Sequence, residues 1–149
     1  MGRILAVDYG EKRVGLAVSD TMQIIANNLT TVSTLEVYNY LEQYLEKEEV
    51  DMIVVGNPKQ LDNTPSQSAK AVRVFVENLA RLLPEVEIFM IDERYTSKIA
   101  SQSIAKSGLK KQKRQDKALI DSVSAVLILQ DFMEMRKGAG QDNIIKIER

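Results

Sequence analysis

The chain has 149 residues, of which 44% are hydrophobic and 28% are charged, and its formal net charge is −1. These values fit a single globular domain with a buried core. The sequence contains no Cys and no His, which excludes disulfides, zinc–thiolate sites, cysteine nucleophiles, Ser-His-Asp triads and histidine metal ligands. Any catalysis would rest on carboxylates, Lys, Tyr, Ser or Thr, or on a bound metal.

The charges are distributed unevenly along the chain. Residues 106–117 contain six positive side chains and one acid, so this segment is +5 and the rest of the chain, with a total of −1, is −6. A local basic segment can contact a phosphate backbone even on a weakly acidic protein. No apolar run approaches the roughly 20 residues that span a bilayer, and the N-terminus does not resemble a signal peptide. The expected location is therefore the cytoplasm.

Three strands are predicted in the first 33 residues, at 4–7, 14–19 and 24–32. The links between them are too short for crossover helices, which indicates an antiparallel meander. A helix is predicted next, from an N-cap at Thr34 through Glu49, because Leu35, Tyr38, Leu41 and Leu45 recur at helical spacing.

Strands and helices then alternate. A buried strand at 53–55 ends at Gly56, a polar loop covers 57–66, an amphipathic helix reaches residue 83 before Pro84, and a buried strand follows at 86–91. Further helices are predicted at 96–106 and at about 116–136. This order predicts an α/β fold with a central mixed sheet of five strands, the meander plus parallel strands, and helices on both faces. One domain is expected over residues 1–137, with a flexible tail at 138–149.

Acidic residues end or interrupt three apolar segments. Asp8 closes the first strand, Asp92 and Glu93 close the strand at 86–91, and Asp121 lies within the apolar stretch of the last helix. Each has an ordinary structural explanation, such as a turn, a cap or an ion pair. Pleat alternation sends Asp92 and Glu93 to opposite faces, so only one of them is expected at a shared centre, and the pattern alone does not say which. Together, acids at strand ends in a chain without His or Cys favour coordination of a hard divalent cation.

The order of short motifs resembles the YqgF/RuvX family of Holliday junction resolvases and pre-16S rRNA processing nucleases. The resemblance rests on the segments 8–20, 55–58, 92–97 and 120–130, which occur in the family's order across about residues 3–135. The sequence departs from the family pattern at Asn57, where Leu is usual, and at residues 62–64, where a Gly is common.

The resemblance implies an RNase H-like fold and a metal-dependent endonuclease. Asp8, Glu93 and Asp121 would be the catalytic and metal-binding acids, which resolves the choice between Asp92 and Glu93. They would hold one or two Mg²⁺ or Mn²⁺ ions that activate water and stabilise the leaving oxygen. The substrate would be structured RNA such as the 5′ end of pre-16S rRNA, branched DNA such as a Holliday junction, or both. The protein would be a monomer or a homodimer.

Basic residues near these motifs are candidates for contacts with the nucleic-acid backbone. They are Arg13, Arg94, Lys110, Lys111, Lys113 and Arg114. A structural salt bridge is an equally good explanation for Arg94, and basic runs are commonly only solvated.

Two other functions fit parts of the pattern. A non-catalytic binding module for nucleic acid or for the transcription machinery would retain the acids for folding or weak metal binding, and Asp8→Asn would then preserve its function. A phosphotransferase would share the Asp-x-Gly turn, but 149 residues leave no room for a two-lobed nucleotide cleft.

Overall fold

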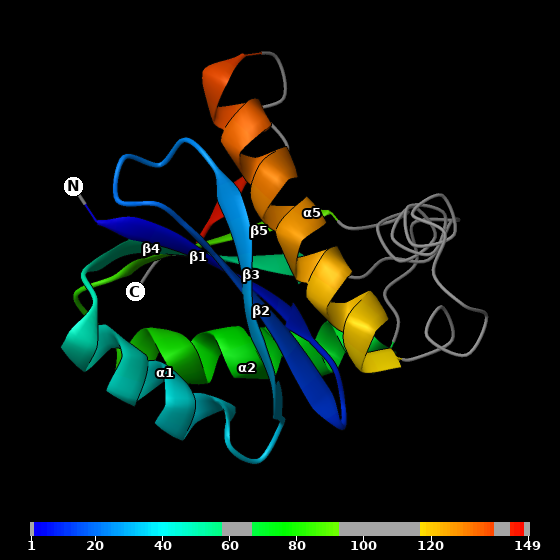
Figure 1. Cartoon of the computed structure of the whole chain (residues 1–149). Helices are drawn as coiled ribbons and strands as arrows, with labels where there is room; N and C mark the ends of the chain where they lie inside the picture. Colours follow the sequence, from blue (N-terminus) through cyan, green and yellow to red (C-terminus); the bar gives the residue numbers. More distant parts are fainter. Residues whose placement is uncertain (1, 58–66, 93–116, 139–143, 148–149) are drawn as a thin grey trace.

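The computed structural model describes residues 2–57, 67–92, 117–138 and 144–147. In this part of the chain, six strands form one sheet in the order β3-β2-β1-β4-β5-β6 (Figure 1). The strands are β1 (Arg3–Tyr9), β2 (Arg13–Ser19), β3 (Ala26–Ser33), β4 (Val50–Asn57), β5 (Glu87–Asp92) and β6 (Ile145–Lys146). The helices are α1 (Val37–Lys47), α2 (Gln67–Leu82) and α5 (Lys117–Lys137). None of the described helices is both long and apolar enough to cross a membrane.

The sheet is mixed, as the sequence predicts. β1, β2 and β3 pair antiparallel, whereas β1, β4 and β5 pair parallel. The sheet has six strands and not the five expected, because β6 pairs antiparallel with β5. β6 lies in the segment 138–149 that was expected to be a flexible tail. A strand of only two residues is too short to produce a recognisable alternation of apolar and polar positions.

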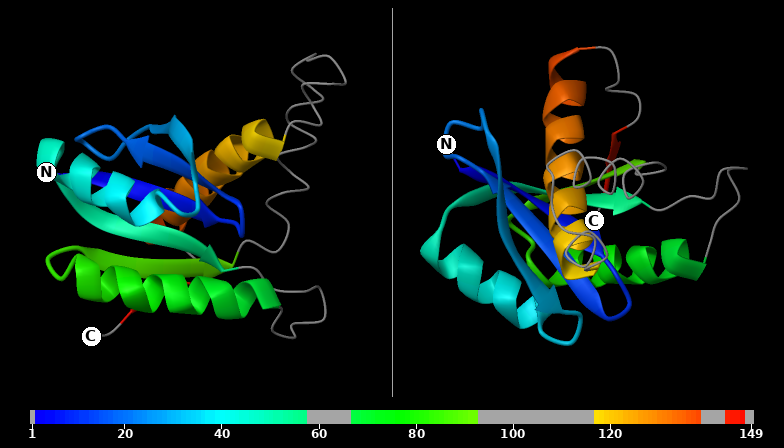
Figure 2. Two further views of the ribbon diagram at one scale, coloured as in Figure 1. Left: turned by 90° about the horizontal axis from the view of Figure 1, so that it is seen from below. Right: turned by 45° about the vertical axis from the view of Figure 1, so that its right-hand side comes forward.

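The two faces of the sheet carry separate hydrophobic cores. Leu5, Val7 and Val55 belong to the core that α1 and α2 cover, where Phe75 of α2 lies 4.5 Å from the Tyr9 ring and 5.5 Å from the Tyr38 ring, measured between centroids. Alternate strand residues belong to the core under α5. The helices therefore cover both faces, α1 and α2 on one side and α5 on the other (Figures 1 and 2).

The start of α1 differs from the prediction. The helix begins at Val37 after Glu36, so Thr34 is not its N-cap, and Leu35 is 92% exposed and contributes nothing to the core. Tyr38 and Leu45 pack against the core as their spacing predicts. Thr34 instead donates a hydrogen bond from Oγ1 to the Gly10 carbonyl at 2.7 Å. This contact is not detectable from sequence because the two residues are 24 positions apart.

Candidate functional site

The carboxyl ends of the parallel strands lie side by side at one edge of the sheet. Val7 of β1 pairs with Val55 of β4, and Asn57 of β4 pairs with Asp92 of β5. The first turns of α5, drawn in yellow, lie at this same end (Figures 1 and 2). We call this the Asp8 edge. Ligand sites in sheets with parallel strands lie outside the carboxyl ends, so this edge is the candidate functional site.

The alternation of β1 places Asp8 on the face that α5 covers. Ile4 and Ala6 pack in the core under α5, whereas Leu5, Val7 and the Tyr9 ring pack in the opposite core. Asp8 continues the row of Ile4 and Ala6, and its side chain is half-buried at the end of that row. A carboxylate in this position is stable only where hydrogen bonds or cations compensate for its desolvation.

Glycines flank Asp8 in the sheet. Gly15 of β2 is its cross-strand partner, and extending the β1–β4 register by one residue beyond Val7 and Val55 brings Gly56 beside it on the other side. Neither neighbour therefore places a side chain next to Asp8 on the α5 face of the sheet. Sequence reasoning missed this feature, because it depends on strand register and not on spacing.

The turn after Asp8 is held by Thr34. Thr34 Oγ1 donates to the Gly10 carbonyl at 2.7 Å, and the Thr34 amide donates to the Lys12 carbonyl at 3.1 Å. Gly10 has no room for a side chain, because a Cβ there would lie 2.5 Å from the Arg13 carbonyl oxygen. These contacts fix the path of the chain immediately beyond Asp8.

The backbone of Asp121 lies near the start of α5. Its position is one turn ahead of Ala125, which is fully buried against the sheet. The helical repeat therefore puts position 121 on the sheet-facing side of α5, at the end nearest the Asp8 edge. The Ser124 hydroxyl, on the same side, is buried and has no hydrogen-bond partner within the described residues.

Of the remaining predicted site residues, the structure describes only Arg13. Arg13 begins β2 and shares the strand parity of Gly15, so it belongs to the α5 face, as Asp8 does. Glu93, Arg94, Lys110, Lys111, Lys113 and Arg114 lie outside the described residues. Within the described ranges no three Asp, Glu, His or Cys side chains form a metal-sized cluster. The grouping of Asp8, Glu93 and Asp121 is therefore still a prediction.

Tyr9 is the titratable neighbour of Asp8 in the chain. Burial against Phe75, with smaller contributions from Tyr38 and Glu11, raises the pKa of the Tyr9 hydroxyl. The hydroxyl is thus protonated at neutral pH and is a poor general base. Its ring also packs on the face of the sheet opposite Asp8, so Tyr9 supports the end of β1 and does not belong to the acidic site.

The chain matches known proteins over almost its whole length. The family model RuvX, described as Holliday junction resolvase, matches residues 2–135. A protein of Parabacteroides distasonis named "Putative pre-16S rRNA nuclease" is 49% identical over 137 residues, which cover 92% of this chain and 98% of that protein. A relative of the same name from Flavobacterium johnsoniae is 44% identical and covers 92% of this chain and 99% of its own length.

Solved structures agree with the fold. The structure titled "T. thermophilus RuvC in complex with Holliday junction substrate" superposes with a TM-score of 0.56 at 15% identity, covering 99% of this chain and 100% of that one. The expected RNase H-like architecture is therefore confirmed as a RuvC-like fold. The match to the family model and the 49% identity across the chain show more than the fold. This chain belongs to the RuvX family.

Proposed function

We propose that this protein is a metal-dependent nuclease that hydrolyses phosphodiester bonds in structured nucleic acid at the Asp8 edge. The observation that carries the proposal is the position of Asp8, half-buried at the carboxyl end of β1, on the α5 face and between two glycines. Membership of the RuvX family and the names of the curated relatives support it.

The face of Asp8 also bears on the choice between Asp92 and Glu93. On β5, Phe89 and Ile91 pack in the core under α5, whereas Ile88 and Met90 pack in the opposite core. Position 93 is the next one with the same parity as Ile91, so continued alternation would direct it to the α5 face. This supports Glu93 and not Asp92, as the family resemblance implies. We therefore assign Asp8, Glu93 and Asp121 as the acidic set, with Asp121 approaching from α5.

This acidic set fits a hard divalent cation. Carboxylate oxygens are the ligands that Mg²⁺ and Mn²⁺ prefer, and no side chain from Gly15 or Gly56 would compete with an ion beside Asp8. Asp8, Glu93 and Asp121 would hold one or two such ions. When bound, the ion would supply Lewis-acid stabilisation for an in-line displacement at phosphorus.

The chain's own residues then have distinct tasks. β1 holds the backbone of Asp8, and the Thr34 contacts hold the following turn, so the backbone that carries the carboxylate would be ordered before substrate arrives. Arg13, on the same face, would meet a backbone phosphate. In the hydrolysis a water oxygen forms a bond to phosphorus, one phosphorus–oxygen bond to a neighbouring nucleotide breaks, and the leaving oxygen takes a proton.

Precursor 16S rRNA is the first substrate to test, because the curated relatives carry that name. A four-way DNA junction is the second, because the family model is described as a Holliday junction resolvase. Both substrates present the same phosphodiester to the same acids, so the acids alone would not distinguish them. Contacts that are made mainly with phosphates carry little information about nucleotide sequence.

The test compares cleavage of both substrates by wild type, Asp8→Asn, Asp121→Asn and the control Asp131→Asn, with Mg²⁺, Mn²⁺ or EDTA. Asp131 is exposed farther along the same helix as Asp121. We expect metal-dependent cleavage by wild type and the control, and losses of at least about 100-fold in the other two variants. Binding of nucleic acid by all four proteins without metal-dependent cleavage would refute the nuclease proposal and favour the non-catalytic binding module.

A further inference from the structure

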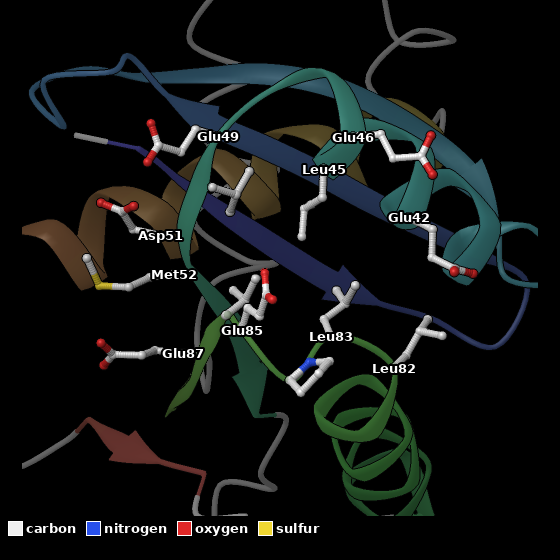
Figure 3. Close-up of a pocket in the computed structure, with 13 residues that line it drawn as sticks. Glu42, Leu45, Glu46, Glu49, Asp51, Met52, Leu82, Leu83, Glu85 and Glu87 are labelled. Carbon is white, nitrogen blue, oxygen red and sulfur yellow. The ribbon is translucent and has the colours of Figure 1, made fainter.

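A groove of about 770 Å³ opens at the end of the sheet opposite the Asp8 edge. It lies between the last turns of α1 and α2 and the first residues of β4 and β5 (Figure 3). β4 runs from this groove to the Asp8 edge and has eight residues, a length of roughly 25 Å. A ligand in the groove would therefore be remote from the proposed nuclease site, and its assignment does not depend on the nuclease proposal.

The groove is lined by acids and contains no Lys or Arg. The six acidic residues are Glu42, Glu46, Glu49, Asp51, Glu85 and Glu87. Two of these acids already have partners in the protein. Glu87 forms an ion pair with Lys146 at 3.4 Å, and Asp51 accepts hydrogen bonds from the Gly2 amide and the Gln23 side chain. The other four carboxylates are on exposed residues and have no ion-pair partner among the described residues.

Two helix carboxyl ends add to this negative potential. α1 ends at Lys47 and α2 ends at Leu82, and residues of both last turns line the groove. The last carbonyl groups of a helix lack intrahelical partners and carry partial negative charge. Glu46 lies in the last turn of α1, where an acid is electrostatically unfavourable. Lys47 is the basic residue of that turn and Arg81 is the basic residue of the last turn of α2, but neither is among the lining residues. The free protein therefore concentrates unfavourable negative charge that a bound cation would relieve.

The bottom of the groove is apolar. Leu45 of α1 points toward Leu83 (Figure 3), and both pack against the core covered by α1 and α2. Val86, which also lines the groove, is 5% exposed. Leu82 at the side is 37% exposed. The groove thus combines an aliphatic bottom with an acidic rim, which suits a ligand that is both cationic and partly apolar.

We propose that this groove binds a basic segment of a partner protein, one in which Lys or Arg side chains accompany aliphatic side chains. The aliphatic stems of Lys and Arg, together with a Leu-sized side chain, would cover Leu45 and Leu83 while the charged ends reach Glu46 and Glu85. Nucleic acid is repelled by the same acids. The separation along β4 allows the partner segment and nucleic acid to bind at the same time.

The test uses a fluorescein-labelled peptide of four Lys-Leu repeats, the full-length chain and fluorescence anisotropy. The groove variant is Glu46→Lys with Glu85→Lys. The matched control is Glu77→Lys with Glu134→Lys, which makes the same charge change at exposed residues outside this groove. Circular dichroism checks that both variants fold. We expect the groove variant to bind at least about tenfold more weakly than wild type and the control variant to bind within about twofold of it.

A second peptide, of four Lys-Ser repeats, tests the apolar bottom. We expect it to bind wild type at least about fivefold more weakly than the Lys-Leu peptide, because it leaves Leu45 and Leu83 uncovered. Equal losses in the groove and control variants, or equal binding of the two peptides, would overturn the proposal in favour of general attraction between polycations and an acidic surface. Self-association of wild type that the groove variant abolishes would overturn it in favour of a second copy of this chain as the occupant.

Discussion

The hydrogen bond from Thr34 to Gly10 links the fold to the proposed chemistry, and Thr34→Val tests that link. Valine keeps the shape of threonine but removes the Oγ1 donor that lies 2.7 Å from the Gly10 carbonyl. The carbonyl is partly exposed, so water can replace part of the interaction. The expected loss in free energy of unfolding is about 1 kcal/mol, the usual net contribution of one hydrogen bond.

This loss converts into a modest change in melting temperature. A chain of 149 residues has an unfolding entropy of about 0.3 kcal/mol/K at an average of roughly 2.1 cal/mol/K per residue. A loss of about 1 kcal/mol therefore lowers Tm by about 3 °C. The turn directly follows Asp8, so we expect kcat for cleavage to fall about tenfold while KM changes by less than about twofold, as for a loss of positioning.

Thr34→Ser is the matched control, because it removes the methyl group and keeps the hydroxyl. It should retain most of the activity and of the thermal stability. Calorimetry supplies the Tm values, and initial rates on the cleaved substrate supply kcat and KM. The reasoning is refuted by a Val variant that loses the expected stability yet cleaves at the wild-type rate, or by Ser and Val variants that behave alike.

Two other changes test the packing and the charge interactions. Phe132→Ala removes a fully buried ring that lies tilted against the Phe89 ring, with 5.3 Å between centroids, and should cost about 3–5 kcal/mol, measured by urea unfolding with an unchanged m-value. Glu134→Ala, at an exposed position, is the control. A cost below about 1 kcal/mol for Phe132→Ala would contradict the assigned core. Asp20 accepts hydrogen bonds from the amides of Ile25 and Ile24, which lower the pKa of its carboxyl. The stability from these bonds is therefore present above the ordinary Asp pKa of about 3.9 and is lost as the pH falls toward the lowered value. Asp20→Asn should lower Tm at pH 7, and its difference from wild type should shrink between pH 5 and pH 2, whereas a constant difference would count against the assigned cause.

The elements that sequence predicts well are those with a strong local pattern. β1, β4 and β5 each contain a run of apolar residues, at 4–7, 53–55 and 88–91, and most residues of these runs are buried. α2 repeats apolar residues at helical spacing. The order and short links of β1, β2 and β3 also make the meander predictable. The strand β6 was missed because it has two residues and depends on pairing with β5.

The candidate site likewise has features that the sequence reveals and features that it does not. Asp8 and Asp121 are detectable because each interrupts an apolar pattern. The face of Asp8, its glycine neighbours and the Thr34 contact depend on register and on long-range packing, which no local pattern encodes. The acidic groove was invisible for a related reason, since its acids come from α1, from the segments before β4 and β5, and from the strands themselves, with no shared periodicity.

The placement of charge suggests how such a chain would meet nucleic acid. The acids proposed for the Asp8 edge would by themselves repel a phosphate backbone, so attraction would come from the proposed cations and from basic residues. Residues 106–117 carry a net charge of +5 and follow β5 in the sequence, ending at Lys117, the first residue of α5. The charged residues that line the groove at the other end of the sheet are all acidic. Under the proposed function, cations bound at the Asp8 edge would attract nucleic acid to that end of the sheet, whereas the acids of the groove would repel it from the other end. This field would orient the protein during encounter although its net charge is only −1.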